Sequence, residues 1–587
     1  MQKHQKLELT WIGKGEEPKL EPRILLEQPE YSYGDPNAEN ILIHGDNLLA
    51  LKALEQDFTG KIKCIYIDPP FNTGAAFEHY DDGIEHSLWL DLMYKRFKIL
   101  HKLLRRDGAL FVHLDDNESA YCKLILDEIF GRDNYLNQII NTTNKPFGFK
   151  STAGNIFKQA NHIFLYTKDK QHFTLNWKAL FIEKSYDPAY KFVFKDKTQP
   201  EEKWEWENIN EVVAKEIGYK SSREAKKSLG EDFDREIALF AIDNSNKVFR
   251  TASVSGGAFL KRKNTVALSK QNKDKIIRHP DDDMDYMFIG GERVIYYNER
   301  LKVIDGLNLP GELITDIWND ISIEALAKEG NVNFPKGKKP EKLIQRCLEL
   351  TTSKGDWVLD SFLGSGTTAA VANKMERKWI GVELGNQAYT HCFPRLKQVV
   401  DGTDQGGISK LVDWQGGGGF KFYTLAPSLL QKDRYGNWVI DEKYNPDMLA
   451  AAMAKQEGFR YQPDEIIYWQ QGRSSEKDFI YTTTQFITVE ALDKIHEEMQ
   501  PGQNLLICCK SFQAACEHKY LNITIKKIPH MLLGRCEFGK DDYSLNIINV
   551  PTSEEAGNPA TEFITNALPE VSQPAAKQKK AQIDLFE

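Results

Sequence analysis

The feature that most constrains the fold is an alternation of short apolar strands and amphipathic helices, which occurs twice in the chain. It runs first from residue 41 to about residue 140 and returns between about residues 306 and 400. Alternation of this kind predicts an α/β domain with a largely parallel sheet. Between the two blocks, residues 141–305 contain long polar segments and clustered aromatic side chains instead. We therefore expect one sheet that is assembled from both flanks of an inserted region.

The first block contains a loop that two consecutive prolines impose. Residues 61–67 form an apolar run typical of a buried strand, and they are followed by Asp68, Pro69, Pro70, Phe71, Asn72, Thr73 and Gly74. Proline cannot donate a ladder hydrogen bond, so the strand must end here. Open α/β sheets bind ligands outside the carboxyl ends of their strands. The loop is therefore a candidate site, although a plain proline turn is the structural alternative.

The residue types of this loop suit an exocyclic amine as the reacting group. The lone pair of the adenine N6 amine is delocalised into the ring, so an enzyme must accept hydrogen bonds from the NH2 group and draw the nitrogen toward tetrahedral geometry. The Asp68 carboxylate and the Pro69 carbonyl offer two acceptors. Pro70 stiffens the loop, and Phe71 offers a face on which an extruded base can stack.

The second block contains a glycine-rich turn between a strand at residues 357–360 and a helix at residues 367–375. Glu383 ends the following strand, about twenty residues after the glycines, which is the layout of a nucleoside-binding βαβ unit. Glycines let the backbone approach a ligand, and the carboxylate can accept both hydrogen bonds of a ribose diol. A tight strand-to-helix turn beside an ordinary acid is the alternative. A phosphate loop is excluded at this turn because no Lys-Ser/Thr pair follows the glycines.

Together the two loops resemble those of the amino-methylating DNA methyltransferases. The resemblance rests on Asp68 to Phe71 and on Phe362-Leu363-Gly364-Ser365-Gly366, in the β-class order, in which the catalytic motif precedes the cofactor motif. Residues 9–14, 21–26 and 43–49 resemble the modification (Mod) subunits of Type III restriction-modification systems. The likeness covers residues from about 9 to 140 and from about 300 to 390.

The resemblance implies a Rossmann-like sheet that binds S-adenosyl-L-methionine (SAM) and methylates N6 of a flipped adenine in duplex DNA. Phe71 stands where many relatives have tyrosine, which keeps the stacking face. Residues 334–343, in which Lys339-Pro340 opens a helix, resemble the segment that covers the methionine moiety of SAM. The implied catalytic residues are Asp68, Pro69, Pro70 and Phe71, and the implied cofactor-binding residues are Asp46, Asp360, Phe362, Gly364, Gly366, Thr367 and Glu383.

The resemblance also implies partners. Related modification subunits act as dimers, so we expect a homodimer. The chain has no Gly-x-x-x-x-Gly-Lys-Ser/Thr loop that would power DNA translocation. We therefore expect an ATPase-nuclease restriction subunit as a separate partner, docking on the C-terminal part of the chain.

The expected domain organisation follows the two blocks and the changes in composition. Residues 415–419 (Gln-Gly-Gly-Gly-Gly) read as a flexible linker, and the C-terminal tail is rich in Pro, Ala, Glu and Lys. We expect an N-terminal segment at 1–40, the catalytic half of the core at 41–140, a target-recognition insertion at 141–305, the SAM-binding half at 306–400, a linker at 401–419, a smaller α+β domain at 420–550 and a mostly disordered tail at 551–587.

A basic stretch within the insertion is the candidate DNA-binding segment. Charge runs are usually solvated surface, but inside a methyltransferase insertion they favour contacts with phosphates, while the bases are read by side chains that the sequence does not identify. The expected DNA-binding residues are Lys261, Arg262, Lys263, Lys270, Lys273, Lys275 and Arg278.

Composition narrows the function classes. The net charge of −9 excludes a protein coated with basic residues, so DNA contacts must come from local patches. The polar N-terminus and the absence of long apolar runs predict a cytoplasmic protein. No cysteine follows a proline, which argues against C5-cytosine methylation. The eight cysteines lack CxxC spacing, so we expect reduced thiols and no metal site.

Several alternatives stay open at this point. N4-cytosine methylation uses similar geometry, and only the Asp at the start of the loop favours adenine. The chain could be a solitary DNA methyltransferase without a restriction partner. RNA or a protein glutamine amide could replace DNA as the substrate. A catalytically idle DNA-binding or assembly subunit is the alternative from a different class.

Overall fold

The computed structural model describes residues 9–11, 13–71, 86–142, 158–280, 286–304, 306–321, 326–334 and 337–543. Residues 72–74 of the proline loop and the tail predicted at residues 551–587 lie outside the described residues.

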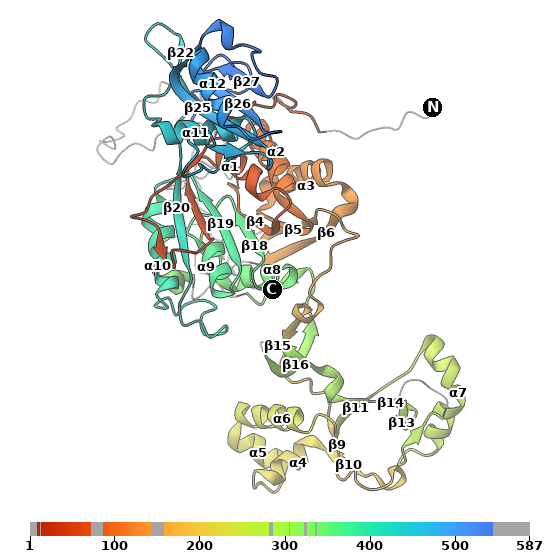
Figure 1. Ribbon diagram of the computed structural model, residues 1–587. Helices are drawn as coiled ribbons and strands as arrows, with labels where there is room; N and C mark the ends of the chain where they lie inside the picture. The colour runs from red at the N-terminus through yellow and green to blue at the C-terminus, as the bar shows by residue number, and fades with distance from the viewer. Residues whose placement is uncertain are drawn as a thin grey trace, which may run out of the picture. The chain divides into compact units, whose positions relative to one another are not determined.

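The largest element is a mixed sheet whose central strands are parallel (Figure 1). The parallel strands are β20, β3, β19, β18, β4 and β5. β7 is antiparallel to both of its neighbours, β5 and β6. β2 (Tyr33–Gly34) pairs with β20 off this path. The strand order is β1 (Leu25–Glu27), β20 (Gly419–Leu425), β3 (Ile41–His44), β19 (Lys378–Glu383), β18 (Trp357–Asp360), β4 (Ile62–Ile67), β5 (Leu104–Leu114), β7 (Ala160–Thr167), β6 (Tyr135–Thr142) and β17 (Ile317–Trp318).

Helices cover both faces of this sheet, as the alternation predicts. Every residue of β4 is buried, because successive side chains point to opposite faces and each face meets helices. Cys64 and Tyr66 pack with α8 (Glu341–Thr351), α9 (Thr367–Lys374) and α10 (Phe393–Val400). Ile65 and Ile67 pack with α1 (Asn47–Phe58), α2 (His86–Leu103) and α3 (Asp116–Phe130).

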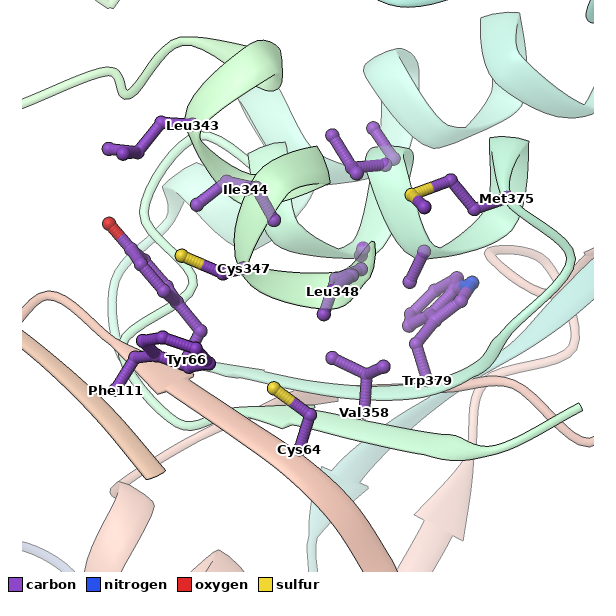
Figure 2. Packing of buried hydrophobic residues seen from close by; sticks show 14 of the residues in the cluster. Cys64, Tyr66, Phe111, Leu343, Ile344, Cys347, Leu348, Val358, Met375 and Trp379 are labelled. Atoms are coloured by element: carbon purple, nitrogen blue, oxygen red, sulfur yellow. The ribbon is translucent and has the colours of Figure 1, made fainter. Parts of the chain in front are cut away.

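The contact between α8 and the sheet shows how the second block is held against the first. α8 places a stripe of apolar side chains against residues of β4 and β5 (Figure 2). Leu343, Ile344, Cys347 and Leu348 recur at helical spacing and are all fully buried. The residues on either side of the insertion therefore share one hydrophobic core.

The insertion carries two sheets of its own and four helices among its described residues (Figure 1). Its larger sheet has the order β10-β9-β11-β14-β13-β12, and its smaller sheet has the order β15-β16-β8. The elements are β8 (Phe181–Glu183), β9 (Phe192–Phe194), β10 (Trp206–Asn208), α4 (Ile209–Glu216), α5 (Ser222–Leu229), α6 (Glu231–Asp243), β11 (Val248–Ala252), α7 (Gly256–Gln271), β12 (Ile277–Arg278), β13 (Met287–Ile289), β14 (Glu292–Tyr296), β15 (Leu301–Ile304) and β16 (Leu307–Leu313).

The C-terminal part contains a second, smaller mixed sheet of order β23-β24-β25-β26-β27. β25, β26 and β27 are parallel, and α12 makes the crossover between the first two. The elements are β21 (Leu430–Lys432), β22 (Trp438–Ile440), α11 (Pro446–Gln456), β23 (Arg460–Tyr461), β24 (Gly472–Arg473), β25 (Asp478–Ile487), α12 (Val489–Glu498), β26 (Asn504–Phe512) and β27 (Ile523–Lys527).

The core sheet extends beyond the predicted boundaries of the insertion. β6 and β7 belong to the core sheet, although residues from 141 onward were assigned to the insertion. β17 also pairs with β6, so the core resumes only at Ile317 and not at residue 306. These strands form the end of the sheet beyond β5, where polar and apolar residues mix along β6 and β17, and the sequence pattern there is correspondingly weak.

The predicted flexible linker at residues 401–419 is folded. Gly417 donates a hydrogen bond to the Val400 carbonyl over 2.8 Å, and Gly419 begins β20, which lies inside the core sheet. A Cβ at Gly416 would meet the Gly402 nitrogen at 2.8 Å and the Val400 oxygen at 2.9 Å. The glycines therefore permit close backbone packing here, which composition alone cannot distinguish from flexibility.

A buried network of charges fastens this segment to the helices. Glu341 accepts hydrogen bonds from Lys374 at 2.8 Å and from Arg395 at 2.9 Å, and Lys374 also donates to Asp404 over 2.8 Å. The side chains of Glu341, Lys374 and Arg395 are fully inaccessible to solvent. The Ile408 amide donates to Glu341 as well, at 3.0 Å. The Glu341 carboxylate thus joins α8 to α9, α10 and residues 404–408.

Two properties of the chain bear on its environment. Within the described residues, no helix combines the length and the apolar composition that crossing a bilayer requires. All eight cysteines are free, and each is buried except Cys536, which is half-buried.

Neutralising Glu341 is expected to destabilise the core strongly. Glu341→Gln leaves two buried cations without their shared counter-charge, and breaking a buried ion pair costs about 3–5 kcal/mol. The free energy of unfolding, measured by denaturant titration, should fall by that amount. Glu236→Gln, an exposed position on α6, is the matched control and should change little. Equal stability of the two variants would contradict the role of the network.

Candidate active site

Four strand ends assemble the site along one edge of the core sheet. β3, β19, β18 and β4 are consecutive neighbours and parallel, so their carboxyl ends lie together. The residues that follow or end them are the Gly45-Asp46 turn, Glu383, the glycine-rich turn after Asp360, and Asp68. The residues predicted for catalysis and for cofactor binding therefore meet at the edge where open α/β sheets bind ligands.

The proline loop is fixed by a helix behind it. The Trp89 indole of α2 donates a hydrogen bond to the Pro70 carbonyl over 2.7 Å, and Trp89 is fully buried. No hydrogen bond to the Pro69 carbonyl occurs within the described residues. This leaves the Pro69 oxygen as an available acceptor beside Asp68.

Asp68 is held by one neighbour on one of its two carboxylate oxygens. Lys339 donates a short hydrogen bond to Oδ2, and the Asp68 and Lys339 side chains are 17% and 13% exposed. Oδ1 is buried and has no hydrogen-bond partner in the described part of the chain. Burial raises the pKa of Asp68, while the Lys339 ammonium acts in the opposite direction. A buried carboxylate oxygen without a donor is costly unless a ligand supplies one.

Lys339 is a site residue whose role sequence reasoning missed. The sequence singled it out only as the start of a helix in a segment that covers the cofactor. In the structure its ammonium also lies 4.9 Å from the centroid of the Phe71 ring. Lys339 thus touches both the acceptor and the stacking face of the proline loop. The available signal was its position directly before Pro340, which fixes the entry into α8.

A buried polar chain lies behind the proline loop. The Tyr66 hydroxyl and His113 Nδ1 are 2.7 Å apart, and Asn161 Nδ2 is 3.0 Å from His113 Nε2, which links β4, β5 and β7. The His113 ring centroid is 6.1 Å from that of Phe71. Burial, with Lys339 and His162 adding to it, holds the pKa of His113 well below its usual value. A neutral imidazole therefore backs the aromatic face of the loop.

The glycine-rich turn is shaped by the two acids that flank it. Asp360 accepts from the Phe362 amide at 2.9 Å and from the Thr368 hydroxyl at 2.6 Å. Glu383 accepts from the Gly364 amide at 2.7 Å and from the Gly385 amide at 3.1 Å. Burial raises the pKa of Asp360 to about 7, and Asp68 and Glu383 add to the rise. The Gly364 and Gly385 amides thus orient the Glu383 carboxylate at the end of β19, beside the glycine-rich turn.

The two glycines of the turn have different surroundings. Both have positive φ, 58° at Gly364 and 81° at Gly366. Among the described residues, a Cβ at Gly364 would meet no heavy atom closer than 4.0 Å, so this side of the turn is open. A Cβ at Gly366 would instead lie 3.4 Å from Cys392. Gly364 therefore faces the space available to a ligand, and Gly366 serves the packing of the turn.

Thr367 and Asp46 are engaged within the protein. The Thr367 hydroxyl accepts a hydrogen bond from Arg395 over 2.8 Å, and Thr367 is buried. Asp46 caps α1 by accepting from the Leu48 amide at 2.8 Å and the Leu49 amide at 3.0 Å. Asp46 is 2% exposed, and its other oxygen accepts from the Tyr543 amide. Both side chains shape the site from behind, and neither presents a free group to a cofactor.

The seven residues predicted to bind DNA do not form a single surface. Arg262 is buried, with its guanidinium carbon 3.7 Å from the centroid of the Tyr286 ring. Arg278 forms an ion pair with Glu201. The prediction of DNA contact therefore does not fit Arg262, which has a packing role instead. The remaining lysines are exposed: Lys261, Lys263, Lys270, Lys273 and Lys275.

Comparison with known proteins shows which family the chain resembles. The family model described as DNA methylase (N6_N4_Mtase) matches residues 62–393. The probable type III restriction-modification enzyme HindVI Mod subunit of Haemophilus influenzae is 35% identical, over 68% of this chain and 55% of that protein. The EcoP15I Mod subunit of Escherichia coli is 26% identical over 72% of each chain. The EcoPI Mod subunit of Escherichia phage P1 is 26% identical, over 63% of this chain and 61% of that protein.

The chain thus spans little more than half the length of the HindVI relative. The matched region contains the proline loop, the glycine-rich turn and Glu383, and it runs across the insertion. On this match, which covers more than half of its residues, the chain belongs to the N6/N4 DNA methylase family.

Proposed function

We propose that this protein transfers a methyl group from SAM to N6 of a flipped adenine in duplex DNA, as the modification and recognition subunit of a Type III restriction-modification system. The observation that carries the proposal is the unpartnered Oδ1 of Asp68, which lies buried next to the Pro69 carbonyl at the carboxyl end of β4. An exocyclic amine carries two N–H donors, which matches these two acceptors.

The proposed chemistry uses the loop to change the geometry of the amine. Asp68 Oδ1 and the Pro69 carbonyl each accept a hydrogen bond from one of the two N–H groups of N6. The nitrogen lone pair is thereby withdrawn from the ring, and N6 becomes nucleophilic. As N6 forms the bond to the methyl carbon, the bond between that carbon and the SAM sulfur breaks and S-adenosylhomocysteine leaves as a neutral thioether. N6 then loses one proton, for which the Asp68 carboxylate is the proposed acceptor. Fixed acceptors of this kind lower the barrier because they need no reorganisation during the reaction.

The residues at the glycine-rich turn fit SAM. When bound, SAM supplies an electrophilic methyl group. The open side of Gly364 leaves room for the nucleoside, and the Glu383 carboxylate, which the Gly364 amide orients, is the proposed partner of the ribose hydroxyls. Phe362 is half-buried in the same turn, where its ring can lie against the adenine moiety. Asp46 and Thr367 support the turn from within the fold.

Extrusion of the base is required because N6 is inaccessible in a stacked duplex. Flipping costs a few kcal/mol, which contacts in the pocket must offset. Phe71 supplies a stacking face, and the neutral His113 behind it adds no charge that would compete with the base. Lys339 lies over the same ring, so base entry and Lys339 must share this space.

N4-cytosine methylation is the second candidate. The matching family model covers both N6 and N4 amines, and the Asp68 and Pro69 acceptors suit either amine. The HindVI and EcoP15I relatives are Mod subunits, which favours a role in restriction-modification. An ATPase-nuclease restriction subunit and a second copy of this chain are the proposed partners.

The reaction and its centre are testable together. Purified protein is incubated with methyl-labelled SAM and a mixed-sequence duplex, and the DNA is digested to nucleosides. We expect label on N6-methyladenine and a loss of at least about a hundredfold in rate for Asp68→Ala, because the loss of one preorganised polar group costs this much. Label on N4-methylcytosine would select the second candidate. SAM binding without labelled DNA would favour the idle subunit.

Lys339 is expected to set the acid limb of the pH–activity profile. Asp68 acts as an acceptor only when ionised, so activity falls as the pH drops through its pKa. Burial raises that pKa and Lys339 lowers it. In Lys339→Met the fall should therefore begin at a higher pH than in the wild type, whereas Lys339→Arg should keep a profile close to the wild type. The check is kcat against pH for all three proteins; superimposable profiles would rule out this role.

The open side of Gly364 should be sensitive to a single methyl group. Gly364→Ala places a Cβ in the space assigned to SAM and strains a backbone at φ 58°. The Kd for SAM, measured by calorimetry, should rise at least about tenfold, equivalent to roughly 1.4 kcal/mol. Gly355→Ala is the matched control, since Gly355 also has positive φ (81°) and no atom within 4 Å. If Gly364→Ala and Gly355→Ala raised the Kd for SAM equally, backbone strain alone would explain the effect, and the assignment of this space to SAM would be wrong.

A further inference from the structure

The helix α7 of the insertion is anchored along one face only. Its inward side chains are Arg262, Thr265, Val266 and Ser269, all of which are buried. The Gly291 amide donates to the Ser269 hydroxyl over 3.0 Å, and the Thr265 hydroxyl is 2.7 Å from His279 Nδ1. α7 lies beside β12 and β13 (Figure 1). These contacts hold the helix rigidly on the larger sheet of the insertion.

The outward face of α7 carries an uncharged stripe. Leu260, Asn264, Ala267, Leu268 and Gln271 recur at the spacing of one helical face, opposite the anchored residues, and all are exposed. Leu260 is 72% exposed and Leu268 is 49% exposed. The side chains of Asn264 and Gln271 make no hydrogen bond within the described residues. Two large apolar side chains and two unused amides on one stripe indicate a binding face.

Lysines border this stripe on both sides. At 100° per residue, Lys261 falls on one side of Asn264, and Lys263 and Lys270 fall on the other. Lys263 and Lys270 form no ion pair in the described part of the chain. The stem of Lys270 packs against Gly291, where an added Cβ would approach its Cγ to within 2.4 Å. The face is thus neutral at its centre and cationic at its margins.

We propose that this face of α7 enters the major groove of DNA and reads base edges. The inference rests on the proposed function, because it assigns the reader of the sequence that the enzyme methylates. The charge pattern fits the groove, where phosphates run along both rims and uncharged base edges form the floor. The lysines reach the phosphates and the central stripe reaches the bases.

The side chains of the stripe match the chemistry of A·T pairs. Asn and Gln amides can bind adenine N6 and N7 in a bidentate manner, and apolar side chains contact the thymine methyl group. Asn264 and Gln271 are the adenine readers, and Leu260, Ala267 and Leu268 are the candidates for methyl contacts. From Leu260 to Gln271 the helix rises about 16 Å, the length of about five base pairs.

The experiment separates DNA binding from methylation. The full-length protein and its variants are mixed with a library of duplexes of randomised sequence, and the bound fraction is sequenced to obtain a consensus. The Kd is measured for the consensus and for each single-base change, and methyl transfer is measured on the same duplexes. Asn210→Ala, an exposed asparagine on α4, is the matched control for Asn264→Ala, and Lys227→Ala on α5 is the control for Lys263→Ala.

We expect Asn264→Ala and Gln271→Ala each to lose roughly 5- to 150-fold of the discrimination at one position of the consensus, as removal of a bidentate contact predicts. Lys263→Ala should weaken binding to all sequences alike and reduce its salt dependence. Asn264→Arg should shift the preference at its position toward guanine, which a merely structural role would not produce. The two control variants should keep the wild-type consensus and the wild-type Kd for DNA. The Kd for SAM should be the same in all variants.

An unaltered consensus in the Asn264→Ala, Gln271→Ala double variant would overturn the inference, as would a wild-type protein that selects no sequence. Sequence-selective binding without methyl transfer would contradict the proposed function and leave the reader assignment standing. The inference would also be overturned if this face of α7 bound a protein and the variants on it kept the wild-type DNA consensus.

Discussion

The structure depends on the pairing of β4 with β18. Cys64 and Val358 are partners in parallel register, although they lie on opposite sides of the insertion in the sequence. Parallel pairing places the carboxyl ends of both strands at the same edge, so the proline loop after β4 and the glycine-rich turn after β18 become neighbours. The electrostatic coupling of Asp68 with Asp360 follows directly from this pairing. Both strands are buried in apolar surroundings, which makes the register hard to shift.

This arrangement brings three acidic side chains close together, which is electrostatically unfavourable. Asp68, Asp360 and Glu383 meet at one strand edge, and burial raises the pKa of the first two. Each acid is stabilised by a different device. Glu383 uses backbone amides, Asp360 uses an amide and a hydroxyl, and Asp68 uses the Lys339 ammonium. Only the last device leaves one carboxylate oxygen unpartnered among the described residues, and this oxygen is the basis of the role proposed for Asp68.

The sequence predicts the elements of the core better than their connections. The strands at residues 61–67 and 357–360 and the helix after the glycines are found within one residue of the predicted bounds, because apolar runs and glycine turns are local signals. The return of β20 into the core sheet is not visible, since Gly416 and Gly417 look flexible until Val400 and Gly402 pack against them. The contact between Lys339 and Asp68 is equally hidden, because it depends on how two distant segments pack.

Polar residues with two plausible roles mark a further limit of sequence reasoning. Asp46 precedes a helix, and an acid in that position suits a cap as well as a cofactor contact; the structure shows the cap. Arg262 lies in a basic stretch, but helical periodicity places it opposite Asn264, on the buried side of α7. In both cases the surrounding fold, which the sequence does not show, decides what the charged side chain contacts.

The insertion is attached at one end of the core sheet, away from the strands that carry the site. The chain leaves the core after β7 and returns through β17, which pairs with β6, the neighbour of β7. Exit and return therefore lie on the two strands that flank β6, at one end of the sheet and several strands away from β18 and β19. Changes within the insertion need not disturb the pairing of β4 with β18. The proposed catalytic centre on the middle strands and the proposed reading surface on the insertion are thus held by different parts of the sheet.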